Sequence, residues 1–219
     1  VIVLSWWLST EATAGLERVD ISENPIGGEG GTALVDAIPS SSLKTIKIGT
    51  SFEVTINECS GAALDCSNQK LGPGQLVVLS WWLSTEATAG LEAVDISENP
   101  ISAPIYKEKS GRRSKNNGVE TYDTDVSGIE ALSTIKVKSL IMRGCELGPK
   151  AITALSSSLA TAGVEAVDIS GNPISGATRA GFGWKGEDSD LAGVEHLCAA
   201  LPSTAVKSLK MSDCHLGPK

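Results

Sequence analysis

Short alternations of apolar and polar residues recur along the chain, and each one ends in a turn followed by another apolar residue. They fit the pattern L-x-L-x-x-N-x-L, where the N position holds Asn, Gln or Cys (Asn24, Gln69, Asn99, Cys145, Asn172 and Cys214). A seventh segment begins at Ile46 and then loses the pattern. A period of two is typical of β-strands, so the pattern predicts about seven short strands.

Helical patterns lie between these segments. Ile152, Leu155 and Leu159 fall at i, i+3 and i+7, as on one face of a helix. A proline follows the Asn of several turns and is expected to stop the strand there, while glycines such as Gly163 are expected to close the helices. The predicted unit is therefore a strand, a turn and a returning helix.

The chain also repeats itself. Residues 4–26 recur at residues 79–101 with one change, Arg18 for Ala93, and a looser copy spans residues 155–174. Alternating Asn-type and Cys-type units of about 28 residues resemble leucine-rich repeats of the ribonuclease-inhibitor-like subfamily. This resemblance implies an α/β fold: a curved, right-handed leucine-rich-repeat solenoid with parallel strands on the concave face and helices on the convex face.

The repeat pattern covers the whole chain, so we expect residues 1–219 to form a single array of about seven strand units, as a fragment of a longer array. Two insertions, 102–125 and 175–190, follow Asn-Pro-Ile turns and should project from one face. The stretch 107–115 is basic; it either contacts an acidic partner or is a solvated insertion.

Charge and cysteine content exclude several classes of protein. The net charge of −8 argues against a nucleic-acid binder, and no apolar run is long enough for a membrane span. The five cysteines lack zinc-site spacing. Cys145 and Cys214 are expected about 10 Å apart, beyond the roughly 7 Å limit for a disulfide. Free thiols indicate an intracellular, reducing compartment, most simply the cytoplasm.

Catalytic chemistry finds little support in the sequence. His196 and His215 have no evident nucleophile partner, and the stretch 27–31 lacks the Lys-Ser/Thr of a phosphate-binding loop. The Asp-x-Asp pairs at 123–125 and 188–190 precede helical patterns, which favours helix capping over metal binding. We therefore expect no enzyme activity, no catalytic residues, no cofactor and no metal.

The polar positions of the strands predict one candidate binding surface. On the concave face they are mostly acidic, which suits a basic protein partner; alternatively, they only keep the strands soluble. The candidate residues are Asp20, Glu23, Asp65, Asp95, Glu98, Arg143 and Asp168.

A second candidate surface lies on the convex side. Val3, Trp6, Val78 and Trp81 fall opposite the inward leucine stripe of two equivalent helices, expected three strand steps apart. A helix that is apolar all round is usually buried. Either a partner covers these residues or they pack laterally within the array.

The function we expect is protein–protein interaction, as a scaffold or a structural subunit of a larger, multi-subunit assembly. The alternative, implied by the resemblance, is a regulator of a soluble enzyme or small GTPase, acting as an inhibitor or in the manner of a GTPase activator.

Overall fold

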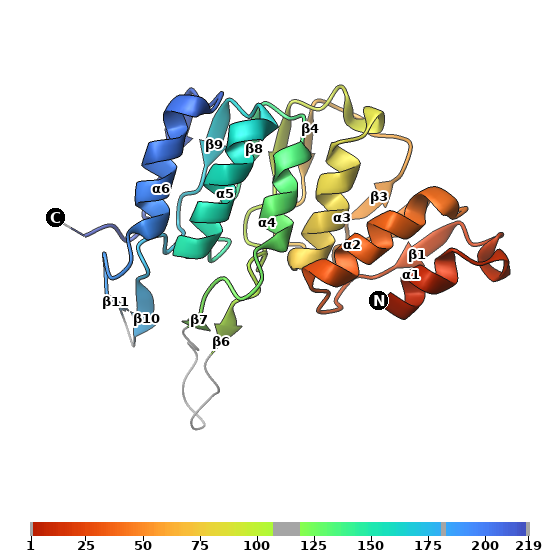
Figure 1. Ribbon diagram of the computed structural model, residues 1–219, viewed down its shortest axis with the longest axis horizontal. Helices are drawn as coiled ribbons and strands as arrows, with labels where there is room; N and C mark the ends of the chain where they lie inside the picture. The colour runs from red at the N-terminus through yellow and green to blue at the C-terminus, as the bar shows by residue number, and fades with distance from the viewer. Residues whose placement is uncertain (1, 107–118, 181–182, 218–219) are drawn as a thin grey trace.

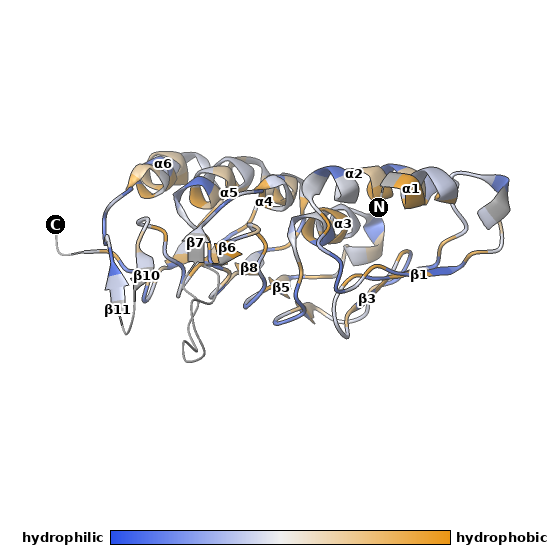
Figure 2. Cartoon of the chain, turned by 90° about the horizontal axis from the view of Figure 1, so that it is seen from below, coloured by the Kyte–Doolittle hydropathy of each residue, from blue (hydrophilic) through white to orange (hydrophobic). Residues whose placement is uncertain are grey.

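The computed structural model describes residues 2–106, 119–180 and 183–217, and it consists of two layers. Helices form one layer and short strands form the other (Figures 1 and 2). The helices are α1 (Ile2–Leu8), α2 (Gly28–Ala37), α3 (Pro73–Leu83), α4 (Ser127–Ala131), α5 (Pro149–Ala162) and α6 (Ala192–Ala200). Single 3-10 turns lie at Glu11–Thr13, Ile38–Ser40, Glu86–Thr88, Leu132–Thr134 and Leu201–Ser203.

Each segment with the repeat pattern forms a parallel strand, as the alternation predicts. These strands are β1 (Arg18–Asp20), β2 (Thr45–Lys47), β4 (Ala63–Asp65), β5 (Ala93–Asp95), β8 (Ser139–Ile141), β9 (Ala166–Asp168) and β12 (Ser208–Lys210). The last five form one parallel sheet in the order β4-β5-β8-β9-β12. Their first apolar positions are in register, so Val94 lies between Leu64 and Leu140.

The strand layer is interrupted after β2, which corrects the expectation of one continuous concave sheet. The chain turns back at residues 49–52 into β3 (Glu53–Thr55), which pairs antiparallel with β2. The resulting sheet, β1-β2-β3, is separate from the five-stranded one. Between β2 and β4 the hairpin strand β3 stands where the other units have a helix.

The helix layer continues across this interruption, because α2 packs directly against α3. The duplicated helices α1 and α3 are therefore separated by one helix (Figure 1). At about 8–10 Å per packed pair, they lie about 16–20 Å apart, closer than the three helix spacings expected if one helix accompanied each of the three strand steps. The curvature and the right-handed sense of the array remain predictions.

Both insertions carry short antiparallel hairpins at the lower edge of the layers in Figure 1. The first holds β6 (Ile105–Tyr106) and β7 (Val119–Thr121), and the second holds β10 (Thr178–Ala180) and β11 (Gly183–Lys185). The basic stretch 107–115 lies outside the residues that the structure describes.

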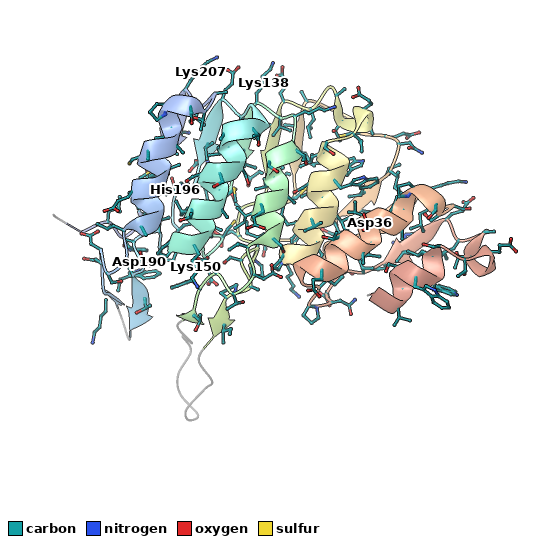
Figure 3. All side chains as sticks on the ribbon, viewed as in Figure 1. Asp36, Lys138, Lys150, Asp190, His196 and Lys207 are labelled. Carbon is teal, nitrogen blue, oxygen red and sulfur yellow. The ribbon has the colours of Figure 1, made fainter. Side chains whose placement is uncertain are left out.

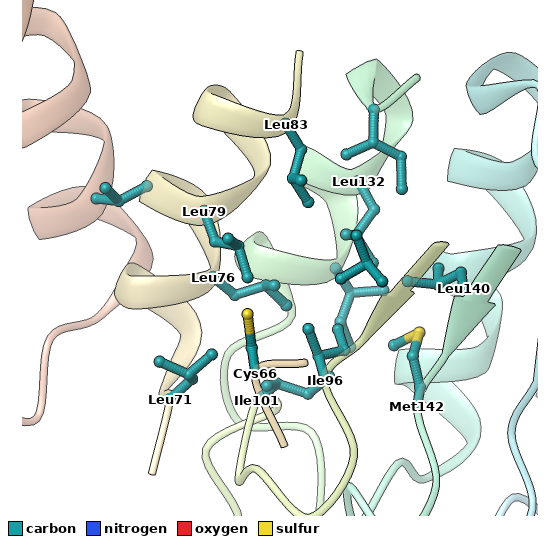
Figure 4. Close-up of a cluster of buried hydrophobic side chains, with 14 of the residues drawn as sticks. Cys66, Leu71, Leu76, Leu79, Leu83, Ile96, Ile101, Leu132, Leu140 and Met142 are labelled. Atoms are coloured by element: carbon teal, nitrogen blue, oxygen red, sulfur yellow. The ribbon is translucent and has the colours of Figure 1, made fainter. Parts of the chain in front are cut away.

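The core lies between the two layers. Leu76 and Leu79 of α3 point toward Ile96 and Leu140 of the strand side (Figure 4), and all four side chains are fully buried. The inward stripe of each helix thus meets the alternate residues of the strands, as the two periodicities require.

Buried amides join neighbouring units at the turns. The Asn99 side chain donates to the carbonyls of Cys66 and Ile96, at 2.9 and 2.8 Å. Its oxygen accepts from the backbone N–H groups of Gln69 and Leu71, at 2.9 and 3.0 Å. One side chain therefore satisfies backbone groups of two consecutive units, where the strand has ended and the helix has not begun.

Asn172 repeats this arrangement one double unit later. It donates to the carbonyls of Met142 and Ile169, both at 2.8 Å, and accepts from the N–H of Leu147 at 3.1 Å. At the alternate position the Cys214 thiol donates to the Ile169 carbonyl at 3.4 Å. Asn and Cys therefore fill the same slot for the same reason, namely a buried carbonyl that needs a donor.

The cysteines are all free thiols, which confirms the expectation from their number and spacing. Cys66, Cys145 and Cys214 are buried, whereas Cys198 is exposed on α6. Burial raises the pKa of the Cys145 thiol to about 12. It also raises the pKa of Cys66 and Cys214, so burial disfavours the thiolate form of all three.

Replacing Asn99 tests the joint between units. Asn99→Ala leaves buried backbone donors and acceptors unpaired, each costing about 1–3 kcal/mol, and we expect the free energy of unfolding to fall by about 3 kcal/mol in urea titrations. The matched control is Asn24→Ala, because Asn24 holds the same slot but is exposed, and within the described residues its side chain donates only to the Ile21 and Ser22 carbonyls. Equal losses in the two variants would contradict this account.

Thiol accessibility provides a second test. In the native protein we expect dithionitrobenzoate to react fast with Cys198 and to leave Cys66, Cys145 and Cys214 unmodified, because burial disfavours their thiolates. In denaturant without reductant, all five cysteines should react. A deficit of two thiols after denaturation would reveal a disulfide and refute the assignment.

Candidate functional site

The four aspartates of the strand face make the same hydrogen bond to the backbone. Each of them accepts a hydrogen bond from the backbone N–H two residues later, at 3.0 Å for Asp20, 2.9 Å for Asp65, 2.9 Å for Asp95 and 3.1 Å for Asp168. The acceptor shapes the turn that leaves the strand, as Asp does in Asx-turns. The acidic pattern is thus accounted for in part by backbone geometry.

Basic side chains from a neighbouring strand and from a strand-end loop neutralise one end of this face. Lys47 lies 3.3 Å from a carboxylate oxygen of Asp20, because β1 and β2 pair in register. Lys70 contacts Glu23 at 2.9 Å. Because of these pairs, Asp20 and Glu23 contribute little net negative charge to the surface that a basic partner would meet.

The pair of Arg143 and Asp168 does the same at the other end. The guanidinium contacts the carboxylate at 2.8 Å, and Asp168 is only 6 % exposed. Asp168 is therefore a buried partner of Arg143, which corrects its placement as an accessible contact residue.

A narrower acidic patch remains in the middle of the strand face. It consists of Asp65, Asp95 and Glu98, for which no ion pair occurs within the described part of the chain. Asp65 and Glu98 are exposed and Asp95 is half-buried. Hydrogen bonds from Ser67 lower the pKa of Asp65, so this carboxylate is charged at neutral pH.

The first convex-side candidate, α1, is uncovered on its outer side. Val3 is 77 % exposed and Trp6 70 % exposed, and the adjacent Trp7 is 43 % exposed. The stretch Ile2–Leu8 contains no charged residue. An uncharged helix that presents two indoles to solvent is unusual among surface helices, which normally carry a polar outer side.

The second copy behaves differently. Val78 is fully buried, so its placement on the outer surface was wrong. Trp81 is half-buried and lines a hollow beside Ile56. Trp82 is 3 % exposed and donates its indole N–H to the Thr55 carbonyl at 2.9 Å. Neighbouring elements cover α3, and nothing in its local sequence indicates this, because α1 has nearly the same residues.

A groove that the sequence did not indicate lies near the beginnings of α2 and α3. It has a volume of about 590 Å³, and prolines from three strand-end loops supply much of its apolar wall: Pro25, Pro73, Pro100 and Pro104. The Asn-Pro turns that line the groove can be recognised in the sequence. That they lie together cannot, because the packing of the helices brings their loops into contact.

The second Asp of each Asp-x-Asp pair lies one residue before the N-cap of the next helix, which is Val126 for α4 and Leu191 for α6, so it is not the N-cap residue that the sequence predicts. Asp125 and Asp190 accept from the N–H groups of Ser127 and Ala192 just after them. The first Asp of each pair accepts from a glycine of the next unit: Asp123 from Gly148 at 3.0 Å and Asp188 from Gly217 at 2.9 Å. Burial raises the pKa of Asp123.

The two histidines lie on different elements. His196 is exposed on α6 (Figure 3), and His215 stacks on Trp184 of β11 with ring centroids 3.7 Å apart. No group of three potential metal ligands occurs in the ranges that the structure covers. The described helices include none long and apolar enough to cross a membrane.

Comparison with known proteins supports the repeat assignment. A family model described as Leucine Rich repeat matches residues 16–35, which span β1 and most of α2. This match supports a leucine-rich repeat protein. No curated protein matches the chain.

The titration of Asp20 separates the two causes of its low pKa. Hydrogen bonds from Ser22 come first, and Lys47 adds to them, so the pKa falls from 3.8 to about 2. Because the folded pKa is depressed, the stabilisation is present above the unfolded value and is lost as the pH falls toward 2. A carbon-detected NMR titration should show that Ser22→Ala raises the pKa of Asp20 more than Lys47→Ala does. The reverse order would show that the ion pair dominates.

Proposed function

We propose that this chain is a protein–protein interaction scaffold, or a structural subunit of a larger assembly. Leucine-rich repeats commonly mediate protein–protein interaction and are generally not enzymes. The observation that carries the proposal is the outer side of α1, formed by Val3, Trp6 and Trp7, which we call the α1 face. Trp is the residue most enriched where binding energy concentrates in protein interfaces.

The chemistry of the α1 face favours a lasting contact. Two indoles and a valine side chain gain free energy on leaving water, at roughly 25 cal/mol per Å². The absence of charge on Ile2–Leu8 means that no ion has to be desolvated on this side. A contact of this kind suits a subunit that stays bound more than a regulator that binds transiently.

The acidic patch of Asp65, Asp95 and Glu98 supplies a second contact for a basic segment of the same partner. Its charge survives because the flanking acids are already paired with Lys47, Lys70 and Arg143. Charges of this kind raise association rates and select partners more than they add affinity.

The finer assignments belong to the same proposal. The alternation of Asn and Cys donors at equivalent turns supports the ribonuclease-inhibitor-like subfamily; the single, curved, right-handed array is proposed from the resemblance to that subfamily. Free thiols support an intracellular, reducing location. The regulator alternative draws on the resemblance alone.

Copurification tests the proposal. The full chain, tagged and purified from its own cells, should elute with a protein partner at fixed stoichiometry. Trp6→Ser should abolish coelution without changing circular dichroism, because an exposed indole contributes little to the fold. The matched control is Trp81→Ser, the same change in the second copy, which should keep the partner.

Two results would contradict this account. Coelution that survives Trp6→Ser would exclude the α1 face as the contact. If the double variant Asp65→Asn/Asp95→Asn lost the partner while the Trp6→Ser variant still coeluted with it, the contact would lie on the acidic patch instead.

A further inference from the structure

The turns after β1 and β4 are in direct contact, although the hairpin β2–β3 separates them in the sequence. The Gly74 N–H donates to the Ile26 carbonyl at 2.8 Å, and the Gln75 side chain donates to the Asn24 carbonyl at 2.7 Å. The backbones come this close because Gly74 has no side chain: a Cβ there would lie 2.4 Å from a methyl carbon of Ile26. These two turns and the loop after β5 form the groove with four prolines in its wall, which we call the proline groove.

The wall of the proline groove offers few free backbone groups. Proline has no N–H, and four prolines stand in the three loops: Pro25, Pro73, Pro100 and Pro104. The Pro100 carbonyl accepts from the Ala103 N–H at 3.2 Å, and the Ala103 carbonyl accepts from the Thr124 hydroxyl. The carbonyls of Asn24 and Ile26 are occupied by the contacts between the turns. An apolar side chain therefore enters this groove without displacing a hydrogen bond that the wall needs.

The loops around the proline groove are fixed to one another. Proline holds its φ at about −65°, which limits the freedom of each loop. At the end of the first insertion, Asp125 accepts from the Gly28 N–H of α2 at 2.9 Å and from the Ser127 N–H of α4 at 3.1 Å. One carboxylate thus joins the beginnings of two helices beside the groove. A surface that is already ordered loses less conformational entropy when a partner binds.

The charge of the groove favours a basic partner. Its lining includes Glu23 and Lys70, which pair with each other at 2.9 Å, and Asp125, for which no ion pair occurs in the part of the chain that the structure describes. Burial acts to raise the pKa of Asp125, but hydrogen bonds from Ser127 and Gly28 lower it, so this carboxylate is charged at neutral pH. The lining therefore has one unbalanced negative charge.

The acidic patch of Asp65, Asp95 and Glu98 belongs to the same two units as most of the groove. Asp65 ends β4 and Asp95 ends β5, and the loops after these strands supply much of the wall. Glu98 stands two residues before Pro100. The surface therefore changes from carboxylates to an apolar wall within the units of β4 and β5.

We propose that the acidic patch and the proline groove together bind one extended segment of a partner protein, in which basic residues stand next to a large apolar residue. The apolar side chain fills the groove, and the basic side chains pair with the patch. Asp65 and Asp95 are partners on paired strands, about 4.8 Å apart. An extended segment advances about 3.3 Å per residue, so nearby basic residues reach both carboxylates. This inference names the segment that the proposed function requires and rests on that function.

The basic stretch 107–115 of this chain matches the proposed segment only in part. It carries lysines and arginines but no large apolar residue, so it supplies the charge and not the group that fills the groove. This difference favours a segment of another protein.

Selection from a phage-displayed library of random dodecapeptides, with the full chain as bait, tests the inference. Selected peptides should combine Lys or Arg with a neighbouring Leu, Ile, Phe, Trp or Tyr and should contain few acidic residues. In an NMR titration of the unmodified chain with a selected peptide, the amide signals of Gly27 and Gly72 in the groove lining should shift.

Two variants block the groove. Ala103→Trp and Pro104→Trp each place an indole in the lining, and each should weaken binding of the selected peptide about tenfold or more, because the apolar side chain is no longer buried. The matched control is Ala87→Trp, the same change at a half-buried alanine of another hollow, which should keep the affinity. Circular dichroism checks that all three variants fold. The double variant Asp65→Asn/Asp95→Asn should weaken binding about threefold, as expected for exposed ion pairs.

Several results would overturn the inference. One is the selection of acidic peptides or of none, and another is full affinity in both folded blocked variants or unshifted Gly27 and Gly72 signals. A tenfold gain in affinity when residues 107–115 are replaced by a Gly-Ser stretch would show that the chain's own segment occupies the site. A dimer that the selected peptide dissociates would show that a second copy does.

The proposed function fails separately from this inference. Trp6→Ser lies outside the groove and should leave peptide binding unchanged. If the peptides bind as predicted but no partner coelutes from cells, only the proposed function is wrong. If a partner coelutes through Trp6 while the blocked variants keep full affinity for the peptides, only the inference is wrong.

Discussion

The stacking of strand units is stabilised by side-chain donors buried at the turns, and the rest of the architecture depends on them. Asn99 and Asn172 each satisfy backbone groups of two consecutive units. A single unit has neither these partners nor enough apolar neighbours to bury its strand and helix. Burial is consequently shared between units, and the exposure of a side chain is decided by the unit beside it.

The hairpin β2–β3 shows how this sharing tolerates an irregular unit. The strand layer is divided there into two sheets, yet α2 and α3 pack together and keep the helix layer continuous. An edge strand normally leaves backbone groups unpaired. Here the Trp82 indole N–H donates to one of these groups, the Thr55 carbonyl of the edge strand β3.

Much of the fold follows from the sequence because it is determined locally. The strands, the Asn and Cys donors, the turns that Asp125 and Asp190 form ahead of α4 and α6, and the free thiols all depend on spacing within one or two units. The neutralisation of Asp20 by Lys47 depends on the register of β1 and β2. The repeat alignment implies this register, but a count of the acidic residues on the strand face does not show it. The burial of Val78 was not predictable, since the same residues at α1 remain exposed. Local sequence carries no signal for a neighbour contributed from elsewhere in the chain.

The central claim is that the exposure of a side chain in the near-identical helices α1 and α3 is decided by the neighbouring elements, which for Trp82 of α3 are α2 and the hairpin β2–β3. Hydrogen exchange of the two indole N–H groups in the unmodified chain measures this most directly. The account predicts that Trp82 exchanges only when the array opens, while Trp7 exchanges at nearly the rate of a free indole. Equal protection of both would contradict it, because the α1 face would then already be covered.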